Sequence, residues 1–374
     1  MTKQDLNKIL YYMIQQGGSD LHLKSGDGIR ARIRGKLLKL VDASLKKEHL
    51  YNLLKEILDN DRYQKFIKEK DLDFSYQLDA NYRFRVNAFC QIEGPSIVMR
   101  VIPTKILTID ELNLPKVVHK FVEMERGLVL VTGVTGSGKS TTLAAIINEI
   151  NEKKEKHIIT IEDPVEFIHK DKKSLINQRS VGDNTKSFAT ALKSALREDP
   201  DVILVGEMRD IETIEIALHA AETGHLVFST LHTLDAKETI NRIVGVFPAE
   251  EQNRIRLVLA SVLQGVISQR LVPTVDKKRT AAMEILLATA RIRDLIAENR
   301  DAEIKDALEE GKEVYGTQSF DQHLLDLVRS GRVDEETALE FATNKDDLKL
   351  KLKNAALASG EAKKVSAIGL KNID

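Results

Sequence analysis

The chain has 374 residues, of which 42% are hydrophobic and 30% are charged. This usage excludes a fibrous or wholly disordered protein and leaves room for two or three domains. Its 56 basic and 57 acidic residues give a net charge of -1, so no global positive field draws the chain onto nucleic acid or anionic lipid. No run approaches the ~18 apolar residues of a membrane span, which predicts no direct membrane insertion. The single Cys90 and the lack of a signal peptide predict a reducing, cytoplasmic location.

Residues 1–101 predict a small mixed α+β domain. Residues 19–40 and 71–101 alternate apolar and polar side chains with glycine between the runs, which indicates short antiparallel strands. Residues 45–66 carry apolar side chains at helical spacing, as does the N-terminus. The apolar positions of that first helix are Leu6, Ile9, Leu10 and Met13.

Residues 102–116 predict a linker and hinge, bracketed by Pro103 and Pro115, because proline interrupts regular structure. The domain that follows, residues 117–345, alternates helical stretches with short, continuous apolar runs. Such runs indicate strands buried on both faces of a mainly parallel sheet, so the fold class is α/β. The runs are 127–131, 157–161, 202–205 and 225–229.

The end of this domain predicts mainly helix. From Pro248 to about Phe341 the spacing of apolar residues is helical, with breaks around Pro273 and Gly311. Residues 346–374 are rich in lysine, alanine and aspartate and lack aromatic side chains. They predict a fraying helix or a loose C-terminal tail.

Residues 133–140 fit the phosphate-binding pattern GxxxxGK[ST], after an apolar strand and before a helix. The glycines allow backbone N–H groups to surround a polyphosphate, Lys139 reaches the β- and γ-phosphates, and Ser140 can hold Mg²⁺. Residue frequencies predict on the order of 0.01 chance matches in a chain of this length. ATP and Mg²⁺ are therefore the expected ligands. The residues predicted to bind nucleotide are Gly133, Thr135, Gly136, Ser137, Gly138, Lys139, Ser140 and Thr141.

Glu207 follows the apolar run 202–205, at the end of a strand where phosphate-loop folds place their metal and water ligands. It is the candidate for polarising the attacking water. Gly206 takes the place where many phosphate-loop enzymes have an aspartate, so a magnesium contact from that position must come from elsewhere or be absent.

A second acidic pair, Glu162 and Asp163, ends another buried strand before Pro164. Two carboxylates there can orient the magnesium shell or the water. The alternative is structural, since Asp163 can cap a turn that precedes a proline.

Two histidines, His225 and His232, lie at the two ends of one predicted strand. A neutral histidine could hydrogen-bond the γ-phosphate or relay its loss to a neighbouring subunit. Each of them alone is more often a structural residue, and metal binding is disfavoured because a third ligand is lacking.

Two arginines, Arg85 and Arg100, lie on predicted strands of the first domain, which has no phosphate loop. They could complete the nucleotide site of a neighbouring copy, because phosphoryl transfer needs fixed cations. From the residues alone, surface salt bridges are the favoured interpretation.

Taken in order, these motifs resemble the secretion ATPase superfamily of type II secretion and type IV pili. The loop around Lys139 is similar to its Walker A motif, residues 159–166 to its Asp box, 202–207 to its atypical Walker B motif and 223–233 to its His box. The resemblance extends from about residue 19 to residue 325. Four motifs in the family's order are a specific signal.

The resemblance implies a PAS-like N-terminal domain, a RecA-like ATPase domain and a homohexamer. It identifies Arg85 and Arg100 with the family's ring-forming arginines, which reverses the preference for salt bridges. Glu207, Lys139, Glu162 and Asp163 then belong to the catalytic set, together with His225, His232 and the two arginines. The implied location is cytoplasmic, at the inner face of the cell membrane, with an inner-membrane pilus platform protein as partner.

Residues 290–296 resemble the AIRNLI motif that is associated with retraction in this superfamily, with Arg291 in place of its alanine and Asp294 in place of its asparagine. The chain also lacks the extra N-terminal domains and the four-cysteine zinc site of assembly and secretion motors. The implied function is a hexameric Mg²⁺-dependent ATPase motor for type IV pilus retraction and twitching motility. An accessory retraction paralogue, or a pilus assembly or type II secretion ATPase, is the alternative.

Two other classes of function fit the sequence less well. A RecA-like nucleic-acid translocase is disfavoured by the near-zero net charge, by the lack of an aromatic basic face and by the absence of tryptophan. A regulatory module that holds ATP without turnover is disfavoured because Lys139, Ser140 and Glu207 are all present.

Overall fold

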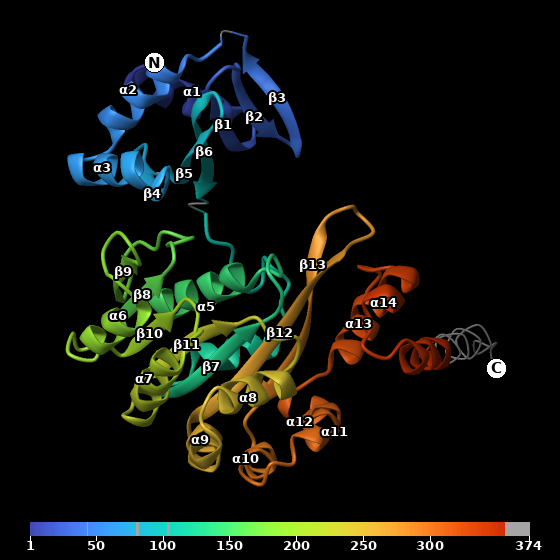
Figure 1. The fold of residues 1–374 in the computed structure, drawn as a ribbon. Coiled ribbons are helices and arrows are strands. Elements are labelled where there is room, and N and C mark those ends of the chain that lie inside the picture. The colour runs from blue at the N-terminus through green and yellow to red at the C-terminus, as the bar shows by residue number, and fades with distance from the viewer. Residues whose placement is uncertain (43, 80–81, 103–104, 356–374) are drawn as a thin grey trace, which may run out of the picture. The chain divides into compact units, whose positions relative to one another are not determined.

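The computed structural model describes residues 1–42, 44–79, 82–102 and 105–355. The chain folds into two units (Figure 1). The first comprises Met1–Ile106 with the short segments Pro164–Ile168 and Gly182–Asn184, and the second comprises the remaining residues. Each unit has its own hydrophobic core.

The first unit packs helices against one face of an antiparallel sheet whose strand order is β3-β2-β1-β6-β5-β4. Helix α1 begins at a capping box between Thr2 and Asp5, which satisfies N–H groups that the helix leaves free. The predicted helical stretch 45–66 is two helices, because Asp59 accepts a hydrogen bond from the Arg62 N–H at 2.8 Å and starts a new helix. The elements are α1 (Lys3–Gln15), β1 (Gly18–Lys24), β2 (Ile29–Ile33), β3 (Lys36–Val41), α2 (Lys47–Ile57), α3 (Asn60–Glu69), β4 (Asp71–Gln77), β5 (Arg83–Gln91) and β6 (Gly94–Ile102).

The two faces of this sheet differ in chemistry. On β5, Phe84 and Val86 are fully buried against the helices, while Arg85 between them is exposed. Because successive side chains of a strand point to opposite faces, this alternation leaves a polar face opposite the core. Arg100 on β6 pairs directly with Arg85 across the ladder, so both arginines lie on that face.

The second unit is a three-layer α/β structure around a sheet of order β13-β12-β7-β11-β10-β8-β9, in which the pairs from β12 to β9 are parallel and β12·β13 is antiparallel. The strands are β7 (Gly127–Thr132), β8 (His157–Glu162), β9 (Leu175–Ser180), β10 (Val202–Val205), β11 (Leu226–Leu231), β12 (Leu263–Pro273) and β13 (Arg279–Leu287). The helices are η1 (Lys116–Val118), α4 (His119–Val122), α5 (Lys139–Lys153), α6 (Phe188–Ala195), α7 (Ile211–Glu222), α8 (Ala236–Gly245), α9 (Ala249–Val262), α10 (Ala290–Ala297), η2 (Asp301–Glu303), α11 (Ile304–Glu310), α12 (Lys312–Tyr315), α13 (Phe320–Arg329) and α14 (Glu335–Phe341).

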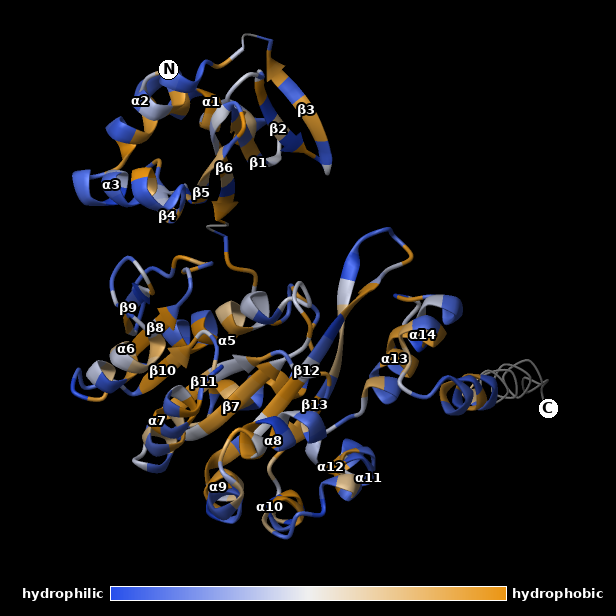
Figure 2. Cartoon of the chain, viewed as in Figure 1, coloured by the Kyte–Doolittle hydropathy of each residue, from blue (hydrophilic) through white to orange (hydrophobic). Residues whose placement is uncertain are grey.

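Burial on both faces explains why the strands of this sheet read as continuous apolar runs. Leu128 and Leu130 of β7 face the core shared with α6 to α9, whereas Val129 and Val131 face the core shared with α4 and α5. Figure 2 shows these central strands as hydrophobic along their length. The predicted α/β class with a mainly parallel sheet is confirmed.

The prediction of mainly helix downstream of Pro248 is wrong between residues 263 and 287. These residues form the long hairpin β12 and β13, and β12 inserts beside β7 in parallel. Val266 and Ile267 of β12 are fully buried on opposite faces of the sheet, so the strand has no amphipathic period to distinguish it from a buried helix. The break at Pro273 is the end of β12.

The linker and the tail differ from their predicted limits. Ile109 and Leu114 are buried in the core of the second unit, so the later part of 102–116 belongs to that unit. Residues 345–355 form a helix, and Leu348 and Leu352 of this helix are buried. The bracketing Pro103 and residues 356–374 lie outside the described residues.

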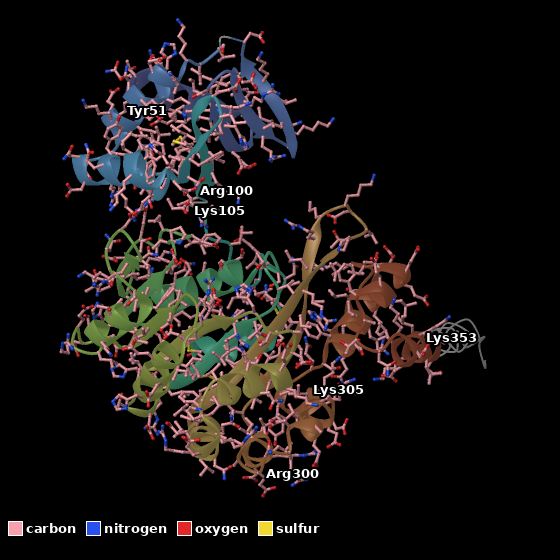
Figure 3. The ribbon with its side chains drawn as sticks, in the orientation of Figure 1. Tyr51, Arg100, Lys105, Arg300, Lys305 and Lys353 are labelled. Atoms are coloured by element: carbon pink, nitrogen blue, oxygen red, sulfur yellow. The ribbon has the colours of Figure 1, made fainter. Side chains whose placement is uncertain are left out.

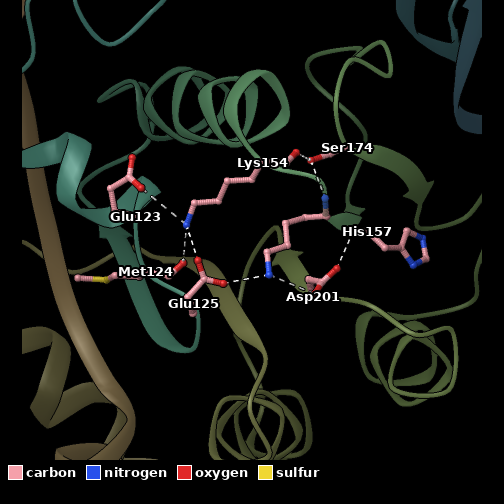
Figure 4. Close-up of polar contacts among 8 residues, drawn as sticks. Glu123, Met124, Glu125, Lys154, His157, Ser174 and Asp201 are labelled. Carbon is pink, nitrogen blue, oxygen red and sulfur yellow. Dashed lines mark hydrogen bonds and ion pairs between the residues drawn. The ribbon is translucent and has the colours of Figure 1, made fainter.

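A network of lysines and carboxylates ties together the edge of the sheet at which strands begin (Figure 4). Glu125, just before β7, binds Lys154 at 2.8 Å and Lys156 at 2.9 Å. Lys156, just before β8, also lies 3.4 Å from Asp201, which precedes β10. Hydrogen bonds from the two lysines hold the pKa of Glu125 below its ordinary value. This edge is occupied by structural ion pairs.

Candidate nucleotide-binding site

The phosphate loop connects the end of β7 to the start of α5 in a conformation that requires glycine. Gly133, Gly136 and Gly138 have φ angles of 141°, 79° and 91°, a region that other residues rarely adopt. A Cβ atom on Gly133 would lie 2.4 Å from the backbone oxygen of Gln269. The loop therefore keeps its backbone close to β12 and turns its N–H groups toward the start of the helix.

Lys139 is the first residue of α5 and is buried. Its Nζ donates hydrogen bonds to the carbonyl oxygens of Gly133 at 2.8 Å and Val134 at 3.1 Å. The ammonium group thus lies over the loop whose N–H groups and helix dipole favour an anion. Ser140 and Thr141 follow in the first turn of α5 and are partly exposed, whereas Thr135 lies at the exposed tip of the loop.

Gln269 on β12 holds the loop in place, and sequence reasoning missed it. Its side-chain nitrogen donates to the Ser137 carbonyl oxygen at 2.6 Å, and its side-chain oxygen accepts from Thr142 at 2.9 Å. All three residues are buried, which makes these hydrogen bonds costly to lose. No signal in the sequence could have indicated Gln269, because its segment was predicted to be helical.

The predicted acids and one histidine gather at the edge of the sheet where the phosphate loop begins. Parallel pairing aligns Val205 with Ile161 of β8 and with Ser229 of β11, so strands β8, β10 and β11 end together. The residues that follow these ends are Glu162, Asp163, Glu207 and His232. Since Leu231 pairs with Thr132, His232 leaves the sheet level with the first residue of the loop.

Glu207 is held as a carboxylate at this edge. Its side chain is 17% exposed and lies 2.6 Å from the Arg209 guanidinium and 3.4 Å from Nε2 of His232. Burial acts to raise the pKa of Glu207, but the hydrogen bond from Arg209 and the nearby positive charges outweigh it and leave the pKa below its ordinary value. Arg209 gives no motif of its own in the sequence, and its role emerges only from this contact.

The neighbouring acid is fixed differently. Glu162 accepts a hydrogen bond from the Thr160 hydroxyl at 2.7 Å, so its position is set from within its own strand. Asp163 is close enough to Arg209 to raise the pKa of that guanidinium together with Glu207, which is the larger cause. Arg209 therefore lies between the carboxylates of two neighbouring strand ends.

Packing explains why glycine occupies position 206. A Cβ atom there would lie 3.2 Å from both Cα of Glu162 and the backbone oxygen of Ile161. The backbone of Gly206 also donates to Ile161 at 2.7 Å and accepts from the Thr230 hydroxyl at 2.6 Å. The strand ends approach so closely that an aspartate at this position would displace β8.

The structure does not bring His225 to this site, which corrects its assignment to the catalytic set. His225 precedes β11 and therefore lies at the opposite edge of the sheet from His232, about 20 Å away along the strand. Its Nδ1 is 2.9 Å from the backbone oxygen of Ala220, and its own backbone oxygen accepts from Gly127 at 2.9 Å. Both contacts are structural ties between β11, α7 and β7.

Arg85 and Arg100 lie opposite each other on β5 and β6 of the first unit. Arg100, labelled in Figure 3, has a side chain that is 69% exposed, and its Nε is 2.7 Å from Asp20. The two guanidinium groups thus form a basic pair on the polar face of that sheet, on a unit without a phosphate loop.

Helix α10 contains the segment that resembles the AIRNLI motif. Ile292, Leu295 and Ile296 are buried, whereas the two departures from the motif, Arg291 and Asp294, are exposed. The departures therefore leave the packed face of the helix unchanged.

Arg293 of the same helix accounts for the arginine of that segment. It donates to the carbonyl oxygens of Ala260 at 2.5 Å and Ser261 at 2.8 Å, which belong to the last turn of α9. Such carbonyls lack partners within their helix, so Arg293 caps α9 and joins it to α10.

Replacing Gln269 by alanine tests the packing of the phosphate loop. The change removes two buried hydrogen bonds at the loop, so we expect nucleotide affinity to fall by about tenfold, the equivalent of about 1.4 kcal/mol. Titration calorimetry with ADP measures this. The matched control is Gln264→Ala on the same strand, which touches Arg293 instead and should leave affinity unchanged. Equal affinities for Gln269→Ala and the parent chain would contradict the role of Gln269.

Among the described residues, no helix is both long and apolar enough to cross a membrane.

Comparison with known proteins places the chain in a family. The family model described as "Type II/IV secretion system protein" matches residues 1–361. The chain is 47% identical over 338 residues to the type IV pilus retraction ATPase PilT of Pseudomonas aeruginosa, which covers 90% of this chain and 98% of that protein. It is 49% identical over 318 residues to a twitching motility protein of Neisseria gonorrhoeae, covering 85% of each.

A solved structure agrees with these relatives. The crystal structure of the pilus retraction motor PilT with bound ADP matches with a TM-score of 0.86 at 43% identity, over 92% of this chain and 98% of that one. The resemblance and the fold class predicted from the motifs are confirmed. The chain therefore belongs to the family of type II/IV secretion system proteins and is an ATPase.

Proposed function

We propose that this chain is a Mg²⁺-dependent ATPase motor that powers type IV pilus retraction as a ring of six copies. The observation that carries the proposal is the gathering of the phosphate loop, Glu207 and His232 at one edge of the sheet. The similarity to a retraction ATPase and to a twitching motility protein, over most of each chain, supports retraction as the work that is done.

The residues of the loop fit a nucleotide with its metal ion. N–H groups of 133–138 and the start of α5 suit the phosphates, and the Nζ of Lys139, which donates to two carbonyl oxygens of the loop, can donate to phosphate oxygens from the same place. The Ser140 hydroxyl would hold Mg²⁺, which neutralises phosphate charge when it is bound. Glu162 and Asp163 lie at the neighbouring strand end, where they can orient the water shell of the ion.

Glu207 is the proposed residue that orients and polarises the attacking water. It is ionised at neutral pH because its pKa is lowered, and it has His232 beside it. His232 is the proposed sensor of the γ-phosphate, since it leaves the sheet beside the loop and its side chain is 41% exposed.

Arg85 and Arg100 are the proposed cations that a neighbouring copy supplies to each site. Both are on the first unit, which has no phosphate loop, and Arg100 projects into solvent. Developing charge on the transferred group requires fixed cations, which explains why hydrolysis would need a ring. Hydrolysis would rotate the two units about the linker, and the motion would pass to an inner-membrane pilus platform protein at the cytoplasmic face of the membrane.

The pH dependence of hydrolysis tests the role of Glu207. Arg209 lowers the pKa of Glu207, and the carboxylate is the active form, so activity is lost as pH falls through that lowered pKa. The change Arg209→Ala raises the pKa and should move the acidic limb of kcat/KM to higher pH, whereas Arg209→Lys should move it less. An acidic limb that stays in place in Arg209→Ala would show that another group controls it.

Mixed rings test the supply of arginine between copies. Chains with Glu207→Gln keep their arginines, and chains with Arg100→Ala keep their phosphate loop and Glu207, so each alone should be inactive. Co-purified rings of both should hydrolyse ATP, because about a quarter of the interfaces in a random mixture are complete. The control mixes Arg100→Ala with the double variant Glu207→Gln, Arg100→Ala, which should stay inactive. Inactive rings in the first mixture would exclude trans sites.

Retraction is tested in the host cell. A strain without the gene should carry abundant surface pili and fail to twitch, because pili would be assembled and not withdrawn. Re-expression of the parent chain should restore twitching, and re-expression of Glu207→Gln should not. Cells without pili would instead indicate an assembly motor, and unchanged motility would assign retraction to another protein.

A further inference from the structure

Asp20 is a buried acid between two arginines on the otherwise polar face of the first unit. It lies on β1, where it pairs with Arg32 of β2 on one side and with Arg100 of β6 on the other. Its side chain is 5% exposed. Burying a carboxylate costs several kcal/mol unless it is paired well, so its place between these arginines calls for a physical reason.

The carboxylate is fully engaged. Oδ1 accepts from Nε of Arg100 at 2.7 Å, and Oδ2 accepts from the Ser19 hydroxyl at 2.7 Å and lies 3.9 Å from Nε of Arg32. Arg32 also donates to the Gly35 carbonyl oxygen at 3.1 Å, which turns its guanidinium toward its own hairpin. Arg100 is thus the arginine that Asp20 orients toward solvent.

The atom through which Arg100 is held matters. A bond through Nε fixes the plane of the guanidinium and leaves its two terminal nitrogens, which carry the paired donors of the fork, to point away from the sheet. The Arg100 side chain is 69% exposed, so those nitrogens face outward. Such a group is already ordered for a bidentate contact with an anion.

The neighbourhood of Arg100 supports the same interpretation. Arg85 lies directly opposite it on β5, and like charges at such a cross-strand pair destabilise a sheet. Asp20 offsets this repulsion, and it can do so because the bonds from Ser19 and Arg100 outweigh burial, which by itself would raise its pKa, and keep the carboxyl ionised.

We propose that Asp20 is the positioning residue for Arg100, fixing its Nε so that the terminal nitrogens are aimed at a phosphate group bound by the neighbouring copy. The proposal rests on the proposed function of Arg100 between copies. It gives a role to the segment 19–22, which the motif comparison includes but to which the nucleotide site of the second unit assigns none.

The first test is the rate of the Asp20→Asn chain and of a double variant. Asparagine keeps the shape and removes the charge, so kcat should fall by about tenfold or more, since misplacing a catalytic cation by about 1 Å can cost 10². If Asp20 acts through Arg100, Asp20→Asn added to Arg100→Ala should lower the rate no further. A double variant clearly slower than Arg100→Ala would overturn the proposal.

The second test asks which partner rescues the Asp20→Asn chain in mixed rings. Glu207→Gln chains supply an intact Arg100 and should restore hydrolysis, whereas Arg100→Ala chains should not, because both chains then lack an aimed arginine. Rescue by Arg100→Ala chains alone would show that Asp20 serves its own nucleotide, and rescue by neither would show a folding role. Either result would overturn the proposal.

Two controls separate the possible failures. Asp27→Asn removes a similar contact in the same unit, where Asp27 accepts from Nε of Arg30 at 2.9 Å, and it should hydrolyse ATP at the parent rate with an unchanged melting temperature. The mixture of Glu207→Gln with Arg100→Ala is run beside it. If that mixture is inactive, the supply of arginine between copies fails and the role of Asp20 fails with it. If the mixture is active and Asp20→Asn is not rescued, the role of Asp20 alone fails.

Discussion

The register of four parallel strands is the constraint on which the site depends. Strands β7, β11, β10 and β8 lie side by side and end together, so residues far apart in sequence meet at one edge. The lysine and carboxylate pairs around Glu125 bind the other edge, where the strands begin. A one-residue slip in any strand would invert which side chains are buried, and both cores hold the register. The chemistry is placed by packing that lies outside the site.

Much of this site could be predicted from sequence because each part has a local signature. The phosphate loop is a continuous pattern, and Glu207 follows an apolar run directly. Gln269 could not be found this way, since it contributes only through a partner 132 residues away in sequence, Ser137. Its strand is buried on both faces and was therefore predicted as helix. His225 shows the opposite error, because a motif joined two histidines that the length of one strand separates.

The first unit follows a simpler rule and was predicted more fully. Alternation of buried and exposed side chains along β5 marks one face as core, and this pattern is visible in the sequence. Cross-strand pairing was not, so neither the meeting of Arg85 with Arg100 nor the contact of Asp20 with Arg100 could be derived from the segments that carry them. Pairing depends on strand order, and strand order β1-β6-β5 is not sequential.

Asp20 and Glu207 are both bound by an arginine, yet their surroundings suit them to different roles. Both oxygens of Asp20 are engaged, and its side chain is 5% exposed, so it cannot accept a further proton donor. At Glu207, Arg209 lies on one oxygen, and His232 lies 3.4 Å from the other, a distance too long for a strong hydrogen bond. The oxygen of Glu207 beside His232 retains the capacity to accept a proton from water. The saturated acid can only orient its partner, whereas the unsaturated one can take part in hydrolysis.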